Sequence, residues 1–507
     1  MAVELQDRAG VAAGSAAASQ APRGSVARLD RWLLVAILLF ALLLRLRGLN
    51  SFSFEQDELY TILEGRDLFA VDLAPGIDGR PLYYLLQHVL LGVLPITPVG
   101  LRIVPLIFGM LGVWATGLTA SRVYGARAGL VAAFLVAIAP WHLHASTYAR
   151  YWSLLYLLAT VFFLNLWLAY RDENPRHYIA AAAALIAGSA THPSFLFAAF
   201  SASAGVSLIR VDGSHGLRLP SARAWRLLWL PYLLFLTGAF LALRWTSSTS
   251  ALQNWGGRGA AASLRLIPAV VEWLGPAIAA AAFLGALSAL TGGRERRSWG
   301  AMAFYGCAGA LLLLLFASTR TDVYADYAFP MVPLVFISAA GLLYQFYERL
   351  TDRSGFTLGV ATAVLAASVA PATASHLSSG TRFDYRPAFS FIRDTSRNTA
   401  VLTWPVIVAR YYAPELDVRG LTMRTSYLDS LLVNDRDFWV VASITRYGMV
   451  VDDDNTVSNW LENNCTLRFS SEKSRWDYRV YRVNVHRCQA ETPTAPATPA
   501  RATASRP

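Results

Sequence analysis

The sequence predicts a polytopic α-helical membrane protein that carries a small α/β domain near its C-terminal end. Two features indicate this fold class: 55% of the 507 residues are hydrophobic against 15% charged, and long apolar runs recur as far as residue 377. Beyond that point the chain turns polar and short strand-like runs appear. The formal net charge of +11 comes mainly from arginines in short loops between apolar runs. Arginines in such loops set membrane topology, so no nucleic-acid partner is expected.

The apolar runs indicate about eleven membrane spans within residues 29–377. Residues 1–28 are rich in Ala, Gly, Ser and Arg without an apolar run, which predicts a disordered cytosolic tail rather than a cleaved signal peptide. The first span is therefore expected to remain as an anchor. The expected spans lie near residues 32–49, 101–121, 128–145, 151–170, 177–191, 193–210, 226–245, 268–291, 299–318, 328–346 and 355–375.

Residues 81–92 decide the topology, because counting them as a span would move every later loop to the opposite side of the membrane. The arginine distribution favours an amphipathic helix on the outer surface. This choice places the N-terminus in the cytoplasm, and the loop of residues 50–100 and the C-terminal domain outside it. The arginines then expected on the cytosolic side are Arg122, Arg127, Arg171, Arg176, Arg210, Arg218, Arg223, Arg226, Arg294, Arg296, Arg297, Arg349 and Arg353.

Residues 378–490 are predicted to form the extracytoplasmic α/β domain. Strands are expected at 400–403, 438–441 and 478–483, with a helix that begins near Ile407. Cys465 and Cys488 could form a disulfide if this region lies outside the cytosol, whereas Cys307 falls in an apolar run. Residues 491–507 are rich in Pro, Thr and Ala and are expected to be a disordered tail.

The loop behind the first span combines carboxylates with arginines at the membrane surface. Its first part reads Glu55-Gln56-Asp57-Glu58, and its second part, Asp78-Gly79-Arg80-Pro81-Leu82-Tyr83-Tyr84, leads into the surface helix; Arg102 opens the next span. A carboxylate can take a proton from a hydroxyl, and arginine binds phosphate through two parallel hydrogen bonds. The only lysine is Lys473, so Schiff-base and P-loop chemistry have no candidate residue in the membrane region.

These motifs resemble the GT-C superfamily of membrane glycosyltransferases, in particular the branch of protein O-mannosyltransferases and aminoarabinose lipid A transferases. Asp57-Glu58 stands where the family has an acidic pair, and Pro81 to Tyr84 matches its Pro-Leu-Tyr-Tyr element. Arg150-Tyr151 follows Pro140, His142 and His144, as an Arg-Tyr pair does in the family. Two departures stand out: Asp78-Gly79-Arg80 replaces the usual His-Pro, and Tyr324-Ala325-Asp326-Tyr327, ahead of Pro330 and Pro333, carries Asp326 in place of an arginine.

The resemblance implies a polyprenyl-phosphate-linked sugar donor and transfer with inversion to a lipid, glycan or protein acceptor, outside a bacterial inner membrane. Asp57 would be the general base, and Glu58 would orient the acceptor or Asp57. Cations would hold the leaving phosphate. A divalent cation is left open, and no other cofactor is expected. The substrate-binding candidates are Glu55, Arg80, Tyr83, Tyr84, Arg102, Arg150, Tyr151, His192, Arg320 and Tyr327.

Structural roles and other functions remain as alternatives. Arg45, Arg47, Arg102 and Arg150 could extend to the interface from helix ends, and Tyr83 and Tyr84 could belong to an aromatic belt. His142, His144 and His192 are expected to pack rather than to bind metal. At the level of the whole chain, the main alternative is a transporter. The absence of an internal repeat and the position of the carboxylates in a loop argue against it. A third alternative is a membrane-anchored binding protein that acts through its C-terminal domain.

Overall fold

The chain folds into two compact units, a large helical unit and a smaller α/β unit. Unit 1 comprises Met1–Leu49 and Thr61–Thr373, and unit 2 comprises Asn50–Tyr60 and Ala374–Pro507. The loop segment with Asp57 and Glu58 therefore packs with the C-terminal residues. The structure is a computed structural model that describes residues 23–66, 80–210, 214–245, 265–320, 323–350, 355–380, 382–396, 399–434, 437–445, 448–450, 452, 454–471 and 481–489.

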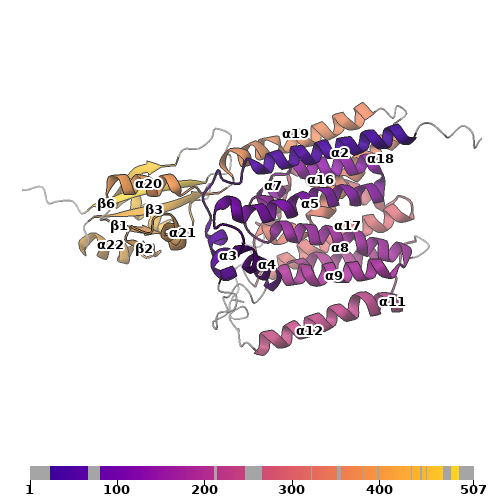
Figure 1. Cartoon of the computed structure of the whole chain (residues 1–507), viewed down its shortest axis with the longest axis horizontal. Coiled ribbons are helices and arrows are strands. Elements are labelled where there is room, and N and C mark those ends of the chain that lie inside the picture. The colour runs from indigo at the N-terminus through magenta and orange to yellow at the C-terminus, as the bar shows by residue number, and fades with distance from the viewer. Residues whose placement is uncertain are drawn as a thin grey trace, which may run out of the picture. The chain divides into compact units, whose positions relative to one another are not determined.

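The long helices of unit 1 lie with their axes roughly along one common line (Figure 1). Its largest helix pairings are α10 with α17, α16 with α18, and α8 with α9. Its helices are α2 (Arg23–Leu46), α4 (Pro81–Leu91), α5 (Pro98–Tyr124), α6 (Ala126–Ile138), α7 (Pro140–Ser146), α8 (Trp152–Asp172), α9 (Pro175–Thr191), α10 (Phe195–Val206), α11 (Ala222–Ala224), η2 (Trp225–Trp229), α12 (Leu230–Trp245), α15 (Leu266–Leu274), α16 (Pro276–Leu290), α17 (Arg294–Ser318), η3 (Ala325–Met331) and α18 (Val332–Arg349). Helix α3 (Gln56–Arg66) begins in unit 2 and ends in unit 1. Helix α19 (Gly355–Ser379) begins in unit 1 and ends in unit 2.

The long apolar helices confirm the predicted polytopic class. Five described helices are long and apolar enough to cross a membrane, or seven if each bent helix pair counts as one span. The number eleven stays a prediction, because several predicted spans form helices of fewer than 18 residues. Examples are α9 with 17, α10 with 12 and α12 with 16.

Two predicted spans are wrong as single helices. The run 128–145 is bent by 67° between α6 and α7, and the run 268–291 is bent by 95° between α15 and α16. Pro140 has no N–H with which to continue α6. Gly275 has a φ of 84°, and a Cβ there would meet the Val369 side chain at 2.6 Å. Both bends thus have a local cause in the sequence.

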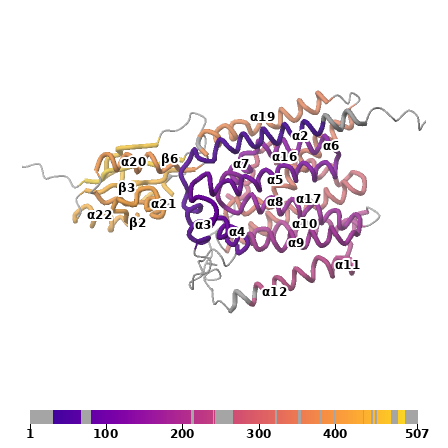
Figure 2. The backbone as a smooth tube through the Cα atoms, viewed as in Figure 1, coloured from indigo at the N-terminus to yellow at the C-terminus, as the bar shows by residue number. Residues whose placement is uncertain are grey.

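The segment 81–92 forms a short helix, as predicted. Helix α4 has 11 residues, which rise only about 16 Å, half of a bilayer core. Pro81 starts it, and Tyr83, Tyr84 and Gln87 are its buried residues. Figure 2 shows α3 and α4 as short turns of the tube beside the much longer α5 and α8. Residues 67–79 precede it, so Asp78 and Gly79 of the predicted motif lie outside the described residues.

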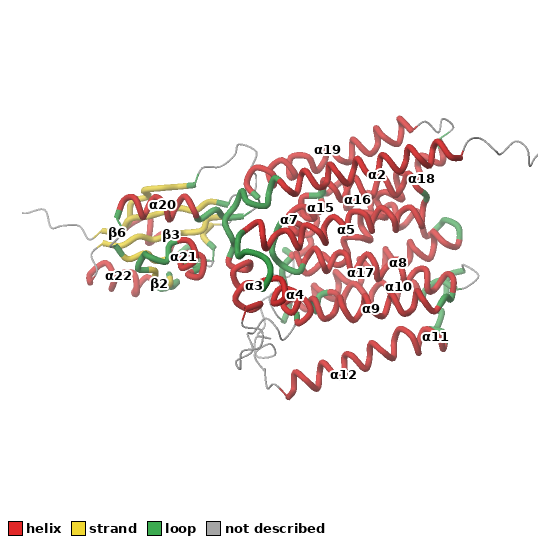
Figure 3. Tube along the Cα trace, viewed as in Figure 1, coloured by secondary structure: helices red, strands yellow, loops and turns green. Residues whose placement is uncertain are grey.

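Unit 2 contains a mixed six-stranded sheet, seen as the yellow strands of Figure 3. The order is β2-β1-β3-β6-β5, with β4 on the end of β3. Strand β1 is parallel to β2 and β3, whereas β6 is antiparallel to β3 and β5. The strands are β1 (Ala400–Thr403), β2 (Val418–Gly420), β3 (Asp437–Thr445), β4 (Gly448–Met449), β5 (Cys465–Ser470) and β6 (Arg482–Gln489), and the helices are α20 (Arg386–Thr395), α21 (Val406–Tyr412), α22 (Thr425–Asn434) and α23 (Thr456–Asn464).

The sheet agrees with most of the predicted strands. Strand β1 coincides with the run at 400–403 and is buried throughout, as expected of a strand with parallel neighbours on both sides. Strand β3 includes the run at 438–441, and α21 begins beside Ile407. The last predicted strand overlaps β6 only at residues 482–483, because β6 begins at Arg482 and continues to Gln489. Residues 478–480 lie outside the described part of the chain.

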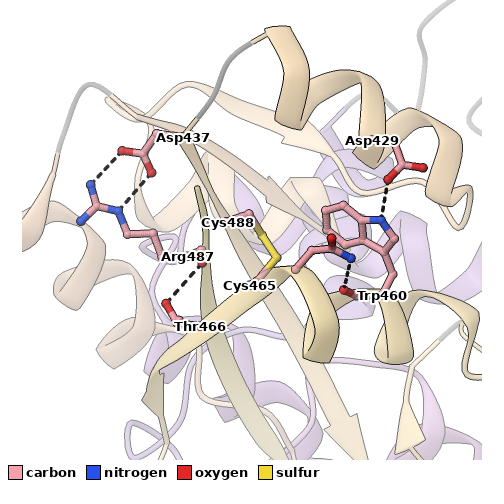
Figure 4. The surroundings of a disulfide bond; sticks show 8 residues. Asp429, Asp437, Trp460, Cys465, Thr466, Arg487 and Cys488 are labelled. Atoms are coloured by element: carbon pink, nitrogen blue, oxygen red, sulfur yellow. Dashed lines mark hydrogen bonds and ion pairs between the residues drawn. A yellow bond between two sulfur atoms is a disulfide. The ribbon is translucent and has the colours of Figure 1, made fainter. Parts of the chain in front are cut away.

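A disulfide joins the two antiparallel strands at the edge of the sheet (Figure 4). Cys465 and Cys488 are direct partners in the register of β5 and β6. Next to Cys488, Arg487 forms a double hydrogen bond to Asp437 at 3.0 and 2.8 Å, which ties β6 to β3. The pairing that the sequence left conditional is therefore present in the fold.

Candidate active site

The acidic segment is fixed within unit 2 through the Ser53 hydroxyl and through backbone groups of its neighbours. Ser53 donates from its hydroxyl to the Phe383 carbonyl at 2.9 Å and accepts from the Tyr385 N–H at 3.2 Å. The Phe54 N–H donates to the Tyr412 hydroxyl, and Arg386 donates to the Ser51 carbonyl at 2.6 Å. These bonds hold the chain just ahead of α3, so the first turn of α3 has a defined position in this unit.

Asp57 and Glu58 have opposite environments although they are adjacent. Asp57 is exposed, whereas Glu58 is fully buried. The Glu58 carboxylate lies 3.7 Å from the Arg382 guanidinium, and both side chains are inaccessible to solvent. Glu58 also accepts from the Glu55 N–H at 3.1 Å, which closes the first turn of α3 as in a capping box. Asp57 is thus the accessible carboxylate, and Glu58 fixes the helix that carries it.

Replacing Glu58 with Gln should destabilise the protein, whereas replacing Asp57 with Asn should not. Glu58→Gln leaves the Arg382 charge buried without its counter-charge, a change that costs about 3 kcal/mol. We expect a lower midpoint of thermal unfolding for Glu58→Gln in detergent and an unchanged midpoint for Asp57→Asn. Equal midpoints for the two variants would contradict the structural role of Glu58.

Arg150 is a buried cation of unit 1. It follows the short helix α7 and precedes α8, and it is 6% exposed. Its guanidinium donates to the Thr61 hydroxyl at 3.3 Å and to the Tyr84 hydroxyl at 3.2 Å. Burial raises the pKa of Tyr84, partly offset by Arg150, so this phenol keeps its proton. The guanidinium is held by neutral oxygens of α3 and α4.

Tyr151 forms a platform between two arginines. The guanidinium carbons of Arg80 and Arg150 each lie 5.0 Å from the centre of the Tyr151 ring, which is within the range of cation–π attraction. Tyr83 packs edge-on against the same ring, with 5.8 Å between the centroids. Arg80 is in place because it is the N-cap residue of α4. Two positive charges therefore share one aromatic ring.

His192 and Tyr327 complete this cluster from more distant parts of the chain. The His192 ring stacks on Tyr151, with centroids 4.9 Å apart, and contacts Tyr327 at 5.0 Å. Its Nδ1 accepts from the Ser194 N–H at 3.1 Å, so the ring proton resides on Nε2. His192 packs through its ring against Tyr151 and Tyr327. We call this set the arginine–aromatic cluster: Arg80, Tyr83, Tyr84, Arg150, Tyr151, Trp152, His192 and Tyr327.

Other predicted site residues have different surroundings. Arg102 is fully buried and donates to the Leu49 carbonyl at 3.0 Å, at the end of the first span. Arg320 is exposed near the end of α17, and no described side chain of the cluster contacts it. Asp326, which replaces the arginine of the family motif, accepts from the Trp141 indole at 2.9 Å. Arg102 and Asp326 therefore form hydrogen bonds within the fold, outside the cluster.

The bend between α6 and α7 is stabilised by polar side chains from α2 and α19. The bend removes helical partners from two carbonyls. Arg45 donates to the Ala137 carbonyl at 3.1 Å, and Thr373 donates to the Ile138 carbonyl at 2.7 Å. Arg45 also donates to His142 Nδ1 at 2.8 Å and is fully buried. The alternative that Arg45 extends to the interface is wrong, and His142 is fully buried beside it.

Arg45→Met should destabilise the bundle. The change leaves the Ala137 carbonyl without the donor that Arg45 supplies and leaves His142 Nδ1 only the Ser146 hydroxyl at 3.3 Å, a loss of about 2 kcal/mol after the cost of burying the guanidinium is regained. Thermal unfolding in detergent should show a lower midpoint, and Arg47→Met, at an exposed neighbour, is the matched control. If both variants unfold at the wild-type temperature, Arg45 does not stabilise the bend.

Sequence reasoning missed several residues that hold the site. Thr61 binds Arg150, Trp152 packs on Tyr151, and Arg382 faces Glu58. Trp152 could have been found from its place beside the Arg-Tyr motif. Among the described residues, no group of three or more His, Cys, Asp or Glu side chains could hold a metal ion. The divalent cation that the sequence left open has no candidate ligand set there.

The fold is similar to that of two crystal structures of ArnT, which confirms the predicted fold class. It is similar to the crystal structure of ArnT from Cupriavidus metallidurans in the apo state, with a TM-score of 0.51 and 15% identity over 91% of this chain and 98% of that chain. The ArnT structure bound to undecaprenyl phosphate gives a TM-score of 0.52 and 14% identity over 89% and 97%. No protein-family model and no curated protein sequence matches the chain. At these identities the likeness establishes the fold alone.

Proposed function

We propose that the protein is a membrane glycosyltransferase that moves a hexose or pentose from a polyprenyl-phosphate-linked donor to a lipid, glycan or protein acceptor. The observation that carries the proposal is the arginine–aromatic cluster in a chain with this fold. Two guanidiniums on one aromatic platform suit a phosphate attached to a long apolar chain, because arginine binds phosphate and rings contact the prenyl or sugar carbons. The ArnT structure bound to undecaprenyl phosphate is an example of a similar fold that binds a polyprenyl phosphate.

In the proposed reaction Asp57 removes the proton from an acceptor hydroxyl, and the oxygen attacks the anomeric carbon. The bond from that carbon to the phosphate oxygen breaks, and its electron pair leaves with the polyprenyl phosphate. A single displacement inverts the anomeric configuration. Arg150 and Arg80 stabilise the charge that develops on the leaving phosphate. The exposure of Asp57 supports its role, since an acceptor must reach it.

Helix α3 links the proposed base to the proposed phosphate site along the chain. It carries Asp57 in its first turn and Thr61, the hydrogen-bond partner of Arg150, four residues later. We therefore assign base and leaving-group roles to residues that one short helix connects. Arg102 and Arg320 are left out of this assignment because of their surroundings.

The proposed location is a bacterial inner membrane, with the N-terminus in the cytoplasm and the C-terminal domain outside. The function is tested by offering purified protein in nanodiscs a panel of polyprenyl-phosphate sugars with cell-envelope acceptors. The anomeric configuration of any product is then read by NMR. A product of inverted configuration supports the proposal, and a retained configuration overturns the single displacement. Solute uptake by proteoliposomes without any sugar transfer would favour a transporter instead.

A further inference from the structure

A second arginine cluster lies at the far end of α8 from Arg150. Helix α8 begins directly after Tyr151 and ends at Asp172, and its 21 residues rise about 30 Å, the thickness of a bilayer core. A pocket at this far end is lined by residues of α8, α10 and α17 and by the loop before α11. The two arginine clusters therefore belong to opposite membrane interfaces. The charged and polar side chains of the pocket are Arg171, Arg210, Arg218, Arg294, Glu295 and Ser298.

Two of these arginines are held in place by aromatic rings and carboxylates. Arg171 lies 4.7 Å from the Trp167 ring centre and bonds Asp172 at 2.6 Å. Arg218 lies 5.1 Å from the Tyr170 ring centre, donates to the Tyr170 carbonyl at 2.6 Å and pairs with Glu173. These bonds use only part of the donor capacity of a guanidinium, which has five N–H groups.

Arg210 and Arg294 supply charge that described carboxylates do not balance. Both side chains are exposed, and no ion pair joins either of them to a carboxylate of the described residues. Within the pocket the single carboxylate, Glu295, approaches Arg171 at 3.9 Å. Asp172, Glu173 and Glu295 offset most of the charge on Arg171 and Arg218, but Arg210 and Arg294 keep the pocket positive, which suits it to an anion.

The surface beside the pocket favours a lipid anion over a dissolved one. Leu217 and Leu219 flank Arg218 and are 66% and 75% exposed, so the loop presents apolar side chains outward while Arg218 contacts the pocket. Exposed leucines next to arginines at a helix end are typical of the headgroup region of a bilayer. We propose that this pocket binds the phosphate headgroup of an anionic phospholipid, independently of the proposed sugar transfer.

The test is a lipid titration of the purified full chain in a neutral detergent, followed by thermal shift. Soluble short-chain phosphatidylglycerol is the probe, and short-chain phosphatidylcholine and inorganic phosphate are the comparison ligands. The wild type should be stabilised by phosphatidylglycerol alone. The double variant Arg210→Gln/Arg294→Gln should bind it about 30-fold more weakly.

A double variant of equal charge, Arg122→Gln/Arg226→Gln, is the matched control, because both of its arginines are exposed and lie outside the pocket. It should keep the wild-type affinity. The single variants Arg210→Gln and Arg294→Gln should each lose part of the affinity, and all variants should unfold at the wild-type temperature without lipid. Equal affinity of the pocket variant and the control would overturn the site. A full shift with inorganic phosphate would overturn the lipid assignment, and one with phosphatidylcholine would overturn recognition of the anion.

Discussion

Asp57→Asn should reduce sugar transfer by at least about 100-fold, and by up to about 10,000-fold, because the amide cannot take a proton from the acceptor hydroxyl. The substitution conserves shape, and the side chain is exposed. The lost activity should therefore appear with an unchanged unfolding temperature. The measurement is the turnover number for polyprenyl phosphate release by protein in nanodiscs.

The control for Asp57→Asn is an exposed carboxylate of the same unit, Asp394, changed to Asn. Asp394→Asn removes one exposed negative charge but no proposed catalytic group, so it should leave the turnover number unchanged. Asp57→Glu should retain a part of the activity, because a carboxylate remains in a displaced position. Near-normal turnover of Asp57→Asn would remove Asp57 from the role of base.

Arg150→Gln should weaken the interaction with the donor by about 10- to 100-fold, seen as a higher KM for the lipid donor. The guanidinium gives charge-assisted hydrogen bonds to phosphate that an amide does not replace. Its bonds to Thr61 and Tyr84 are also lost, so kcat should fall as well. Steady-state kinetics at varied donor concentration separate the two effects.

Tyr84→Phe tests how much of the effect of Arg150→Gln comes from the lost hydrogen bond between Arg150 and the Tyr84 hydroxyl. It removes one bond to Arg150 but keeps the charge and the ring, so the effect on KM should be much smaller than that of Arg150→Gln. Arg122→Gln, at an exposed arginine outside the cluster, should behave as wild type. A donor KM that is unchanged in Arg150→Gln would assign Arg150 to structure alone.

The features that could be predicted from the sequence are those encoded by local patterns. Apolar runs indicated the membrane class, and Pro81 with its short apolar run indicated α4. The buried run at 400–403 indicated a central strand, and the Arg150-Tyr151 pair marked the start of α8. In each case the signal lies within a few residues of the feature, so one sequence was sufficient.

The features that were missed depend on contacts between distant residues. The counter-charge of Glu58 is Arg382, more than 300 positions away, and nothing near either residue indicates the partner. The bend at Ala139 likewise relies on Arg45 and Thr373, which satisfy the freed carbonyls from other helices. Hydropathy counts such a bent run as one span. Arg102 and Arg320 carried the same signal as Arg150, and only their surroundings distinguish them.

The most direct test of the central claim is the release of free polyprenyl phosphate from a polyprenyl-phosphate sugar by wild-type protein in nanodiscs, with and without acceptor. The account predicts release that depends on the acceptor, equals the amount of glycosylated product and falls by at least about 100-fold in Asp57→Asn. No release from any donor of a broad panel by well-folded protein, or equal release by the wild type and Asp57→Asn, would contradict it.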